Sequence, residues 1–172
     1  MNDKSSAPTA TETEKRASAV KAAQRTARWA RIMTKVLISK SSNKSPQRQP
    51  QWEILNFLGP KKGESRGIID LLAIRKSHAD PGEGLKRGDL LDLVIIQVKG
   101  GSARYPTEND RKRLLGVKAH YRAREVILSE WQEGSKARFY RLADEDWQLL
   151  EKPEEIFSPK RRKLTLAKPN KR

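Results

Sequence analysis

Three short apolar segments in the middle of the chain limit the fold more than any other feature of the sequence. They run from Trp52 to Leu58, from Gly67 to Ile74 and from Leu90 to Lys99, and each has the length and the β-branched or aromatic content of a strand. The stretches between them contain turn residues, with Gly and Pro at 59–64 and again at 80–84. Two successive hairpins are therefore predicted, and they form a three-stranded antiparallel meander.

Helices are expected before and after this meander. Residues 14–38 are rich in Ala, Lys and Arg, and their apolar residues recur at roughly helical intervals, which predicts a basic amphipathic helix. The sequence Thr-Glu-Asn-Asp at 107–110 is typical of a helix N-terminus, because Thr caps and acids favour the first turn. A second helix is predicted from about 107 to 122.

The remaining elements complete an α/β fold. Segments 125–131 and 137–142 flank a Gly-containing turn and are expected to be strands, whereas 144–150 is expected to form a closing helical turn. The expected fold class is α/β, with a central mixed sheet flanked by helices. The predicted parts are a disordered N-terminus (1–13), the basic helix (14–38), a linker (39–51), the α/β domain (52–157) and a basic disordered tail (158–172).

The charge of the chain points to a polyanionic partner. Lys and Arg number 37 and Asp and Glu 21 among 172 residues, which gives a formal net charge of +16. Nucleic acid is the commonest partner of such a chain, and we expect DNA rather than RNA. Two other interpretations are a charged surface that only keeps the protein in solution and a surface that binds acidic lipid.

Several classes of protein are disfavoured by the sequence. The absence of cysteine excludes disulfides and thiolate zinc sites. The longest apolar run, Leu90 to Ile96, contains Asp92 and is far shorter than the roughly 20 residues that span a bilayer. The polar start of the chain is unlike a secretory signal, so a cytoplasmic location is expected. The sequence also contains no Gly-rich phosphate loop and no nucleophile elbow.

One acid inside an apolar strand requires an explanation, because burial of an unpaired carboxylate costs several kcal/mol. Asp70 lies within the second predicted strand, and the third predicted strand ends with Gln97 and Lys99, which alternation places on one face. A register that pairs Asp70 with Gln97 centres the hairpin between residues 83 and 84, inside the predicted turn. Their Cβ atoms would then lie about 5 Å apart, close enough to share a cation.

Such a cluster suits phosphodiester hydrolysis. A hard cation held by oxygen atoms polarises the phosphate and lowers the pKa of a bound water. Asp70 would supply the anionic ligand, and the Gln97 side-chain oxygen and the Val98 carbonyl would supply neutral ones. Lys99 would orient the nucleophile or stabilise negative charge. Mg²⁺ is the expected cofactor, and Gly100 with the glycine after it would let a backbone approach closely.

At these residues the chain resembles the PD-(D/E)xK nuclease superfamily, and the resemblance covers about residues 52–131. It implies a restriction-endonuclease-like core of helix, three meandering strands, helix and strand. Asp lies on the second strand of that core and (D/E)xK on the third. The resemblance also implies that Asp70 and the residue at 97 hold magnesium and that Lys99 takes part in catalysis.

Two positions depart from the common pattern of this superfamily. Gln97 replaces an acid, as in the QxK variant of Mrr-type restriction enzymes, and Ile69 replaces the Pro before Asp70. The change at 97 removes one negative charge from the proposed metal site. Glu53 on the first predicted strand or Glu64 in the first turn would be the nearest candidates to compensate for it.

A set of cations is expected to surround this edge of the sheet and to contact phosphates. The cations are Lys61, Lys62, Arg66, Arg104, Arg111, Lys112, Arg113 and Lys118. The sequence therefore predicts a metal-dependent nuclease that acts on DNA. The alternative is a nucleic-acid-binding protein that keeps the fold without catalysis, or a basic RNA-associated protein.

Overall fold

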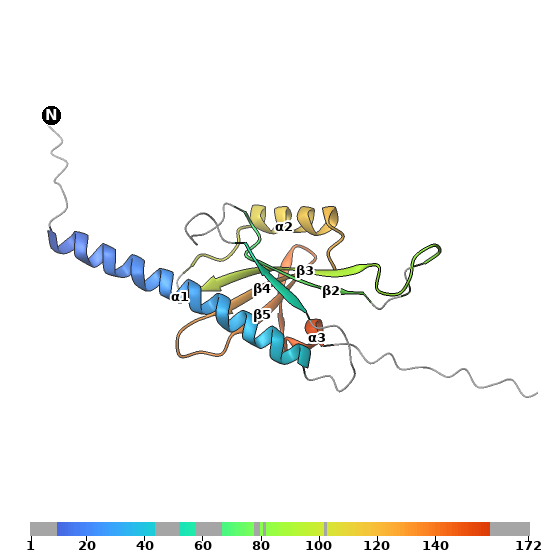
Figure 1. The fold of residues 1–172 in the computed structure, drawn as a ribbon. Helices are drawn as coiled ribbons and strands as arrows, with labels where there is room; N and C mark the ends of the chain where they lie inside the picture. The colour runs from blue at the N-terminus through green and yellow to red at the C-terminus, as the bar shows by residue number, and fades with distance from the viewer. Residues whose placement is uncertain are drawn as a thin grey trace, which may run out of the picture.

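A mixed β-sheet in the order β1-β2-β3-β4-β5-β6 forms the centre of the molecule, which is described here by a computed structural model (Figure 1). The structure describes residues 10–43, 52–57, 67–77, 80, 82–101 and 103–158. In chain order the elements are α1 (Ala10–Asn43), β1 (Glu53–Asn56), β2 (Leu71–Lys76), β3 (Leu91–Gly100), α2 (Glu108–His120), β4 (Glu125–Trp131), β5 (Arg138–Ala143), β6 (Asp146–Leu150) and α3 (Glu154–Phe157). The expected α/β class, with a central mixed sheet flanked by helices, is confirmed.

The order of the strands follows from how they are connected. β1, β2 and β3 form the predicted antiparallel meander, and β4, β5 and β6 are also joined as antiparallel neighbours. Only β3 and β4 are parallel, and the connection between them contains α2. Parallel neighbours require such a crossover, because a tight turn can only reverse the chain.

The register of the β2–β3 hairpin agrees with the predicted one. Leu71 lies opposite Ile96 and Leu72 opposite Ile95. The strand ends at Leu71, and the Asp70 N–H donates to the Ile96 carbonyl, so Asp70 lies outside this register and its pairing with Gln97 stays a prediction. The connection turns at residues 83 and 84, where the predicted centre of the hairpin lies.

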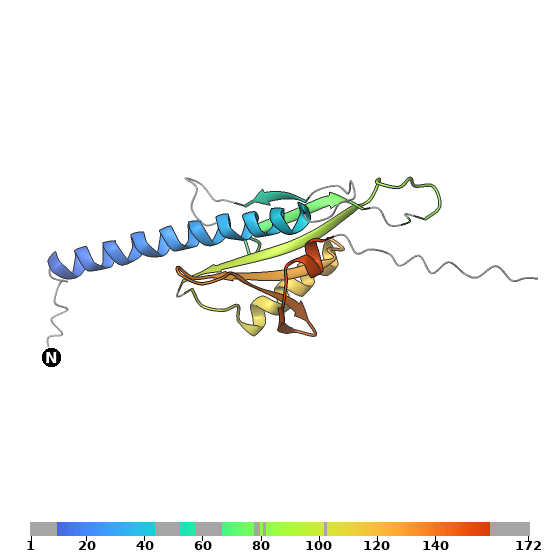
Figure 2. The ribbon, with the colours of Figure 1, turned by 90° about the horizontal axis from the view of Figure 1, so that it is seen from below.

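Helices cover both faces of the sheet, so the molecule has three layers (Figures 1 and 2). On one face, Ile38 of α1 and Ile156 and Phe157 of α3 join a buried cluster with Leu71 and Ile96 of the sheet. On the other face, Leu114 of α2 packs with Ile95, Val126 and Leu142. We refer to these as the α1 face and the α2 face.

The first helix is longer than predicted. It begins at Ala10 and ends at Asn43, although its expected limits were 14 and 38, so part of the predicted N-terminal tail and part of the predicted linker are helical. Near its C-terminal end, the Ser41 hydroxyl donates to the Leu37 carbonyl at 2.7 Å, which allows a polar residue to continue the helix. Residues 1–9, 44–51 and 159–172, which hold the rest of the predicted tails and linker, lie outside the described residues.

Contact between α1 and the sheet is closest at the end of β3. The Thr34 and Ser129 hydroxyls hydrogen-bond at 2.7 Å in a buried position. A Cβ atom added to Gly100 would lie 3.0 Å from the Thr26 carbonyl oxygen and 3.1 Å from the Ala30 Cβ. The glycines after Lys99 therefore do admit a close backbone, and that backbone belongs to α1.

The C-terminal part of the domain corrects one prediction and adds one element. Residues 146–150 form strand β6 rather than a helical turn, because the chain reverses at Asp144 and Glu145, whose φ angles are 49° and 66°. Two left-handed residues of this kind match the twist of a two-residue hairpin. The short helix α3 was not predicted.

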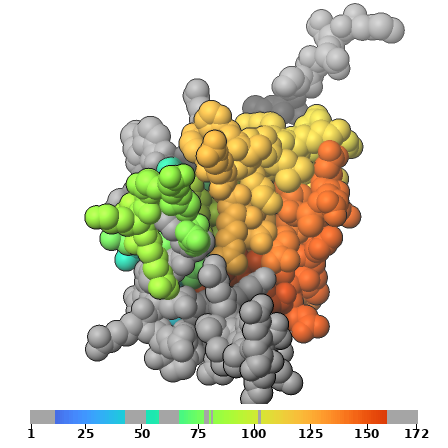
Figure 3. Space-filling view, turned by 90° about the vertical axis from the view of Figure 1, so that its right-hand side faces the viewer, coloured from blue at the N-terminus to red at the C-terminus, as the bar shows by residue number. Residues whose placement is uncertain are grey.

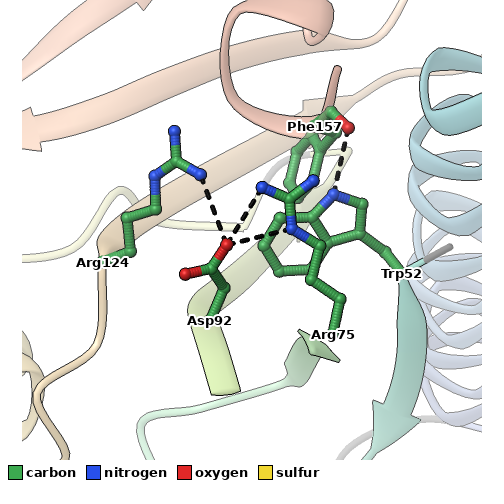
Figure 4. A network of polar contacts seen from close by, with 5 residues as sticks. All are labelled: Trp52, Arg75, Asp92, Arg124 and Phe157. Carbon is green, nitrogen blue, oxygen red and sulfur yellow. Dashed lines mark hydrogen bonds and ion pairs between the residues drawn. The ribbon is translucent and has the colours of Figure 1, made fainter. Parts of the chain in front are cut away.

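A charged network closes the end of the sheet at which β2 finishes and β3 begins (Figure 4). The Arg75 Nε donates to the Asp92 carboxylate at 3.0 Å, and the Arg124 guanidinium lies 3.7 Å from the same oxygen. The Arg75 guanidinium also stacks 4.3 Å above the centre of the Trp52 ring, whose Nε1 donates to the Phe157 carbonyl at 3.0 Å. Figure 3 faces this end of the molecule, with the 82–90 loop in green.

Among the described residues, no helix combines the length and the apolar composition needed to cross a membrane.

Candidate functional site

The polar residues predicted from the sequence lie at the opposite end of the same hairpin, where β2 begins and β3 ends. Leu71 and Ile96 belong to the α1 face, while Leu72 and Ile95 belong to the α2 face. Since side chains alternate along a strand, Gln97 and Lys99 of β3 both belong to the α2 face. The structure therefore brings these two residues to one face, and Asp70 lies just before β2 at the same end of the hairpin.

Asp70 caps the end of the β2–β3 ladder with its side chain. Its backbone N–H donates to the Ile96 carbonyl at 3.1 Å, and its Oδ2 accepts from the Val98 N–H at 2.7 Å. A strand residue directs its N–H and its C=O to the same side, so the Val98 carbonyl also faces the Asp70 edge. The carboxylate and this carbonyl are thus neighbours, as the predicted ligand set requires.

Gln97 has a buried oxygen atom that lacks a hydrogen-bond partner. Its Oε1 is inaccessible to solvent and accepts no hydrogen bond from the part of the chain that the structure describes. An unsatisfied buried acceptor costs about 1–3 kcal/mol. A cation or a hydrogen-bond donor placed beside this atom would remove that cost.

Parallel pairing brings an additional acid to Lys99. Lys99 of β3 lies beside Glu130 of β4 in register, and alternation places both side chains on the α2 face. The Tyr140 hydroxyl donates to Glu130 Oε2 at 3.1 Å. Glu130 could not be predicted from the sequence, because no turn fixes the register of a parallel pair of strands.

Tyr105 completes this group of side chains. Its ring meets that of Tyr140 edge to face at 6.3 Å. Burial of the hydroxyl raises the pKa of Tyr105, and hydrogen bonding to Glu130 and to Tyr140 raises it further. The hydroxyl therefore remains protonated at physiological pH and can hydrogen-bond to the Glu130 side chain.

The Lys99 ammonium forms no ion pair within the described ranges. The residue is partly buried, and its charge acts on Asp110 in the first turn of α2. Hydrogen bonds from Thr107 lower the pKa of Asp110, and the charges of Arg113 and Lys99 contribute further. Lys99 is thus available to a ligand at this edge.

Of the two acids proposed to compensate for Gln97, the one that the structure describes lies far from it. Glu53 of β1 pairs with Ile74 of β2. Ile74 is four residues along β2 from Asp70, which corresponds to a distance of about 13 Å. Glu64 lies outside the described residues. Across the described part of the chain, no group of three or more His, Cys, Asp or Glu residues is arranged to hold a metal ion. Asp70 is therefore the single carboxylate of the proposed ligand set.

The predicted phosphate-binding cations that the structure describes differ in their exposure and in their contacts. Arg104 is exposed in the connection before α2, and Lys118 is half-buried in the last turn of that helix. Arg111 donates to the Glu145 carbonyl at 2.6 Å, Lys112 pairs with Glu108 at 2.6 Å and Arg113 lies 3.8 Å from Asp110. These three are consecutive on the helix and so point in different directions. Lys61, Lys62 and Arg66 lie outside the described residues, and the role of all eight in binding stays a prediction.

A shallow polar hollow includes Glu130 in its lining. Its described lining residues are Glu130, Gln132, Ser135, Lys136 and Arg138, at the end of the β4–β5 hairpin.

No family model, curated protein or solved structure matches the chain.

Proposed function

We propose that this protein is a metal-dependent nuclease of the PD-(D/E)xK type that hydrolyses phosphodiester bonds, with DNA as its substrate. The observation that carries the proposal is the contact of the Asp70 carboxylate with the Val98 N–H, between Gln97 and Lys99 in sequence, together with the buried and unsatisfied Gln97 oxygen. Ligands of open α/β sheets commonly bind at the carboxyl ends of parallel strands. β3 and β4 end at this edge.

The order of the elements supports the same proposal. A helix, an antiparallel meander of three strands, a second helix and a fourth strand follow one another along the chain, and the fourth strand pairs with the third. This is the order that the resemblance to the superfamily implies. The likeness of order is support for a restriction-endonuclease-like core and not a measure of ancestry.

The residues of the site have distinct roles in this proposal. Asp70, the Gln97 oxygen and the Val98 carbonyl would hold Mg²⁺, which when bound supplies Lewis-acid polarisation of the phosphate and acidifies a water. Lys99 donates hydrogen bonds to a phosphate oxygen or to the attacking water. Glu130 orients the ammonium of Lys99 from the neighbouring strand. Tyr105 and Tyr140 keep Glu130 in position by hydrogen bonding.

One observation favours a second candidate function, a nucleic-acid-binding protein without catalysis. Asp70 is the single carboxylate of the ligand set, and one of its oxygens already accepts a backbone N–H. Divalent ions are usually held by more than one anionic ligand or by several waters. A net charge of +16 would serve binding in either case.

The two candidates differ in a cleavage assay. Plasmid DNA and RNA are incubated with the protein in Mg²⁺, in EDTA, and with Lys99→Ala. Lys76→Ala is the matched control, because Lys76 is an exposed lysine at the other end of β2. Cutting that requires Mg²⁺, is lost in Lys99→Ala and persists in Lys76→Ala supports the nuclease. Tight, salt-sensitive binding without cutting would contradict it and support the second candidate.

A further inference from the structure

The N-terminal half of α1 extends past the edge of the sheet that carries the candidate site. Thr26 and Ala30 lie against Gly100, which directly follows Lys99. Residues 12–25, which precede Thr26, are exposed along their whole length. At about 1.5 Å per residue they extend roughly 20 Å beyond this contact. Figures 1 and 2 show this part of the helix standing clear of the rest of the molecule.

This half of the helix is basic. We define the basic arm as residues 15–28, which contain five cations and no acid. Lys21, Arg25 and Arg28 are spaced by four and three residues, so they share one face of the helix. From the first to the last the helix rises about 10 Å, whereas one DNA strand rises about 3.4 Å per phosphate. The stripe is long enough for two or three successive phosphates.

The arm has little within the described chain to balance its charge. Arg25 lies 3.9 Å from Glu133, and the two side chains are 67% and 76% exposed, so this pair contributes little. Like charges at Lys21 and Arg25, and at Arg25 and Arg28, repel one another across a helical turn. A polyanion bound along the stripe would convert this repulsion into attraction.

The composition of the arm selects among the possible ligands. Between residues 15 and 28, Val20 is the one large aliphatic side chain, so the arm lacks the apolar face that inserts into a bilayer. A second copy of the chain would bring like charges together. The phosphate backbone of a nucleic acid matches both the charge and the spacing of the stripe.

We propose that the basic arm binds the phosphate backbone of a nucleic acid along the face of α1 that points away from the end of β3. The exposed residues 12–25 offer about 20 Å of helix to the bound segment, which corresponds to about six base pairs. This inference rests on the proposed function because it takes nucleic acid as the ligand, but it does not require cleavage. It places part of the affinity for nucleic acid on α1 and the cleavage of the phosphodiester bond on the α2 face.

The test compares two triple variants that remove equal charge. The arm variant is Lys21→Gln, Arg25→Gln and Arg28→Gln; the control is Lys76→Gln, Lys86→Gln and Arg122→Gln, all exposed and remote from the arm. Glutamine keeps the helix propensity, and circular dichroism checks that each variant is folded. Binding to a 30-base-pair duplex is measured from 50 to 300 mM NaCl.

The arm variant should lose affinity by on the order of tenfold for each lost contact at 0.1 M salt, with a salt slope lower by about 2–3. The control should change affinity less than about threefold, because salt screens charges beyond about 10 Å. An unchanged slope in the arm variant overturns the inference. So does competition by polyglutamate or by phosphatidylserine vesicles at the phosphate concentrations at which DNA competes. Cleavage by the parent protein is scored separately, so failure of the arm and failure of the nuclease proposal are distinguishable.

Discussion

The two ends of the β2–β3 hairpin carry polar clusters that are arranged in opposite ways. At the closed end, the Asp92 carboxylate meets the guanidiniums of Arg75 and Arg124, and Arg75 stacks on Trp52. At the open end, the Gln97 oxygen has no described partner and Lys99 forms no described ion pair. The same two strands therefore support a cluster in which charges satisfy one another and a cluster that leaves groups for a ligand.

This difference separates stability from function along one element. Burial of charge is compatible with stability when the charges are paired and hydrogen-bonded, and Arg75 is 11% exposed in such a pair. At the other end, buried polar groups without hydrogen-bond partners reduce the stability of the fold unless a ligand binds to them. Functional sites are regions where local consistency is commonly given up in this way. Mutations at the two ends should therefore affect different measurements.

The largest effect is expected from Asp70→Asn at the open end. Asparagine can still accept the Val98 N–H through its side-chain oxygen, so stability should stay within about 1 kcal/mol. Loss of the single carboxylate should lower cleavage on the order of 1000-fold, about 4 kcal/mol of transition-state stabilisation. Plasmid cleavage rates and urea denaturation measure the two quantities. A variant that cleaves at the parental rate would contradict the assignment of the catalytic site to the open end.

The matched substitution Asp92→Asn should have the opposite outcome. It leaves Arg75 and Arg124 without their shared anion, and we expect the free energy of unfolding to fall by about 3 kcal/mol. The folded fraction should keep its cleavage rate at low temperature, because the network lies at the far end of the strands. Equal stability of the two Asn variants would show that the closed end does not stabilise the fold.

The sequence could predict Gln97 and Lys99 on one face, with Asp70 at the same end of the hairpin, because two simple rules govern the strands. A hairpin fixes antiparallel register, and the two-residue period of a strand fixes the face. Asp92 is also an acid in an apolar strand, so the sequence alone did not distinguish it from Asp70. Its partner Arg124 lies in the connection before β4, which is distant in sequence and comes near Asp92 only in the fold. Glu130 was missed for a similar reason, because packing of α2 and not a turn sets the β3–β4 register.

Other parts of the fold were less predictable from local patterns. The turn before β6 contains Asp144 and Glu145 in left-handed conformations without a glycine, so the sequence lacks the usual hairpin signal. The C-terminal end of α1 was misjudged because the Ser and Asn content of residues 39–43 is typical of a linker. In this helix the Ser41 hydroxyl instead donates to the Leu37 carbonyl.

A third substitution tests the contact between α1 and the open end. Gly100→Ala places a Cβ 3.0 Å from the Thr26 carbonyl, and since backbone atoms must shift, we expect a loss of about 2 kcal/mol of stability. Gly116→Ala is the control, because its added Cβ meets no atom within 4 Å in helix α2. That variant should gain about 0.5–1 kcal/mol. Thermal denaturation of the two variants distinguishes them by opposite signs.

Replacement of Gln97 by methionine should sharpen the comparison further. Methionine has a similar shape and no oxygen, so removal of the unsatisfied acceptor should stabilise the fold by about 1 kcal/mol. Cleavage should be lost, since the site loses a ligand oxygen. Gln148→Met on the exposed part of β6 should change neither quantity by more than about 0.5 kcal/mol. A destabilised Gln97→Met variant would mean that Gln97 already contributes to the fold.

The smallest effect concerns acid stability at the open end, where Asp110 closes the capping box of α2. Its carboxylate accepts from the Thr107 N–H at 3.0 Å and hydroxyl at 2.8 Å, and these bonds lower the pKa of Asp110. A lowered pKa means that the folded state binds this proton less readily than the unfolded chain. The stabilisation is therefore present above the pKa of the unfolded chain, about 3.9, and is lost as pH falls through the pKa of the folded state.

In urea denaturation from pH 7 to pH 2, Asp110→Asn should be less stable than the parent by a constant amount above about pH 5, and the difference should shrink below about pH 4. A difference that persists unchanged to pH 2 would assign the effect to the shape of the side chain and not to its charge.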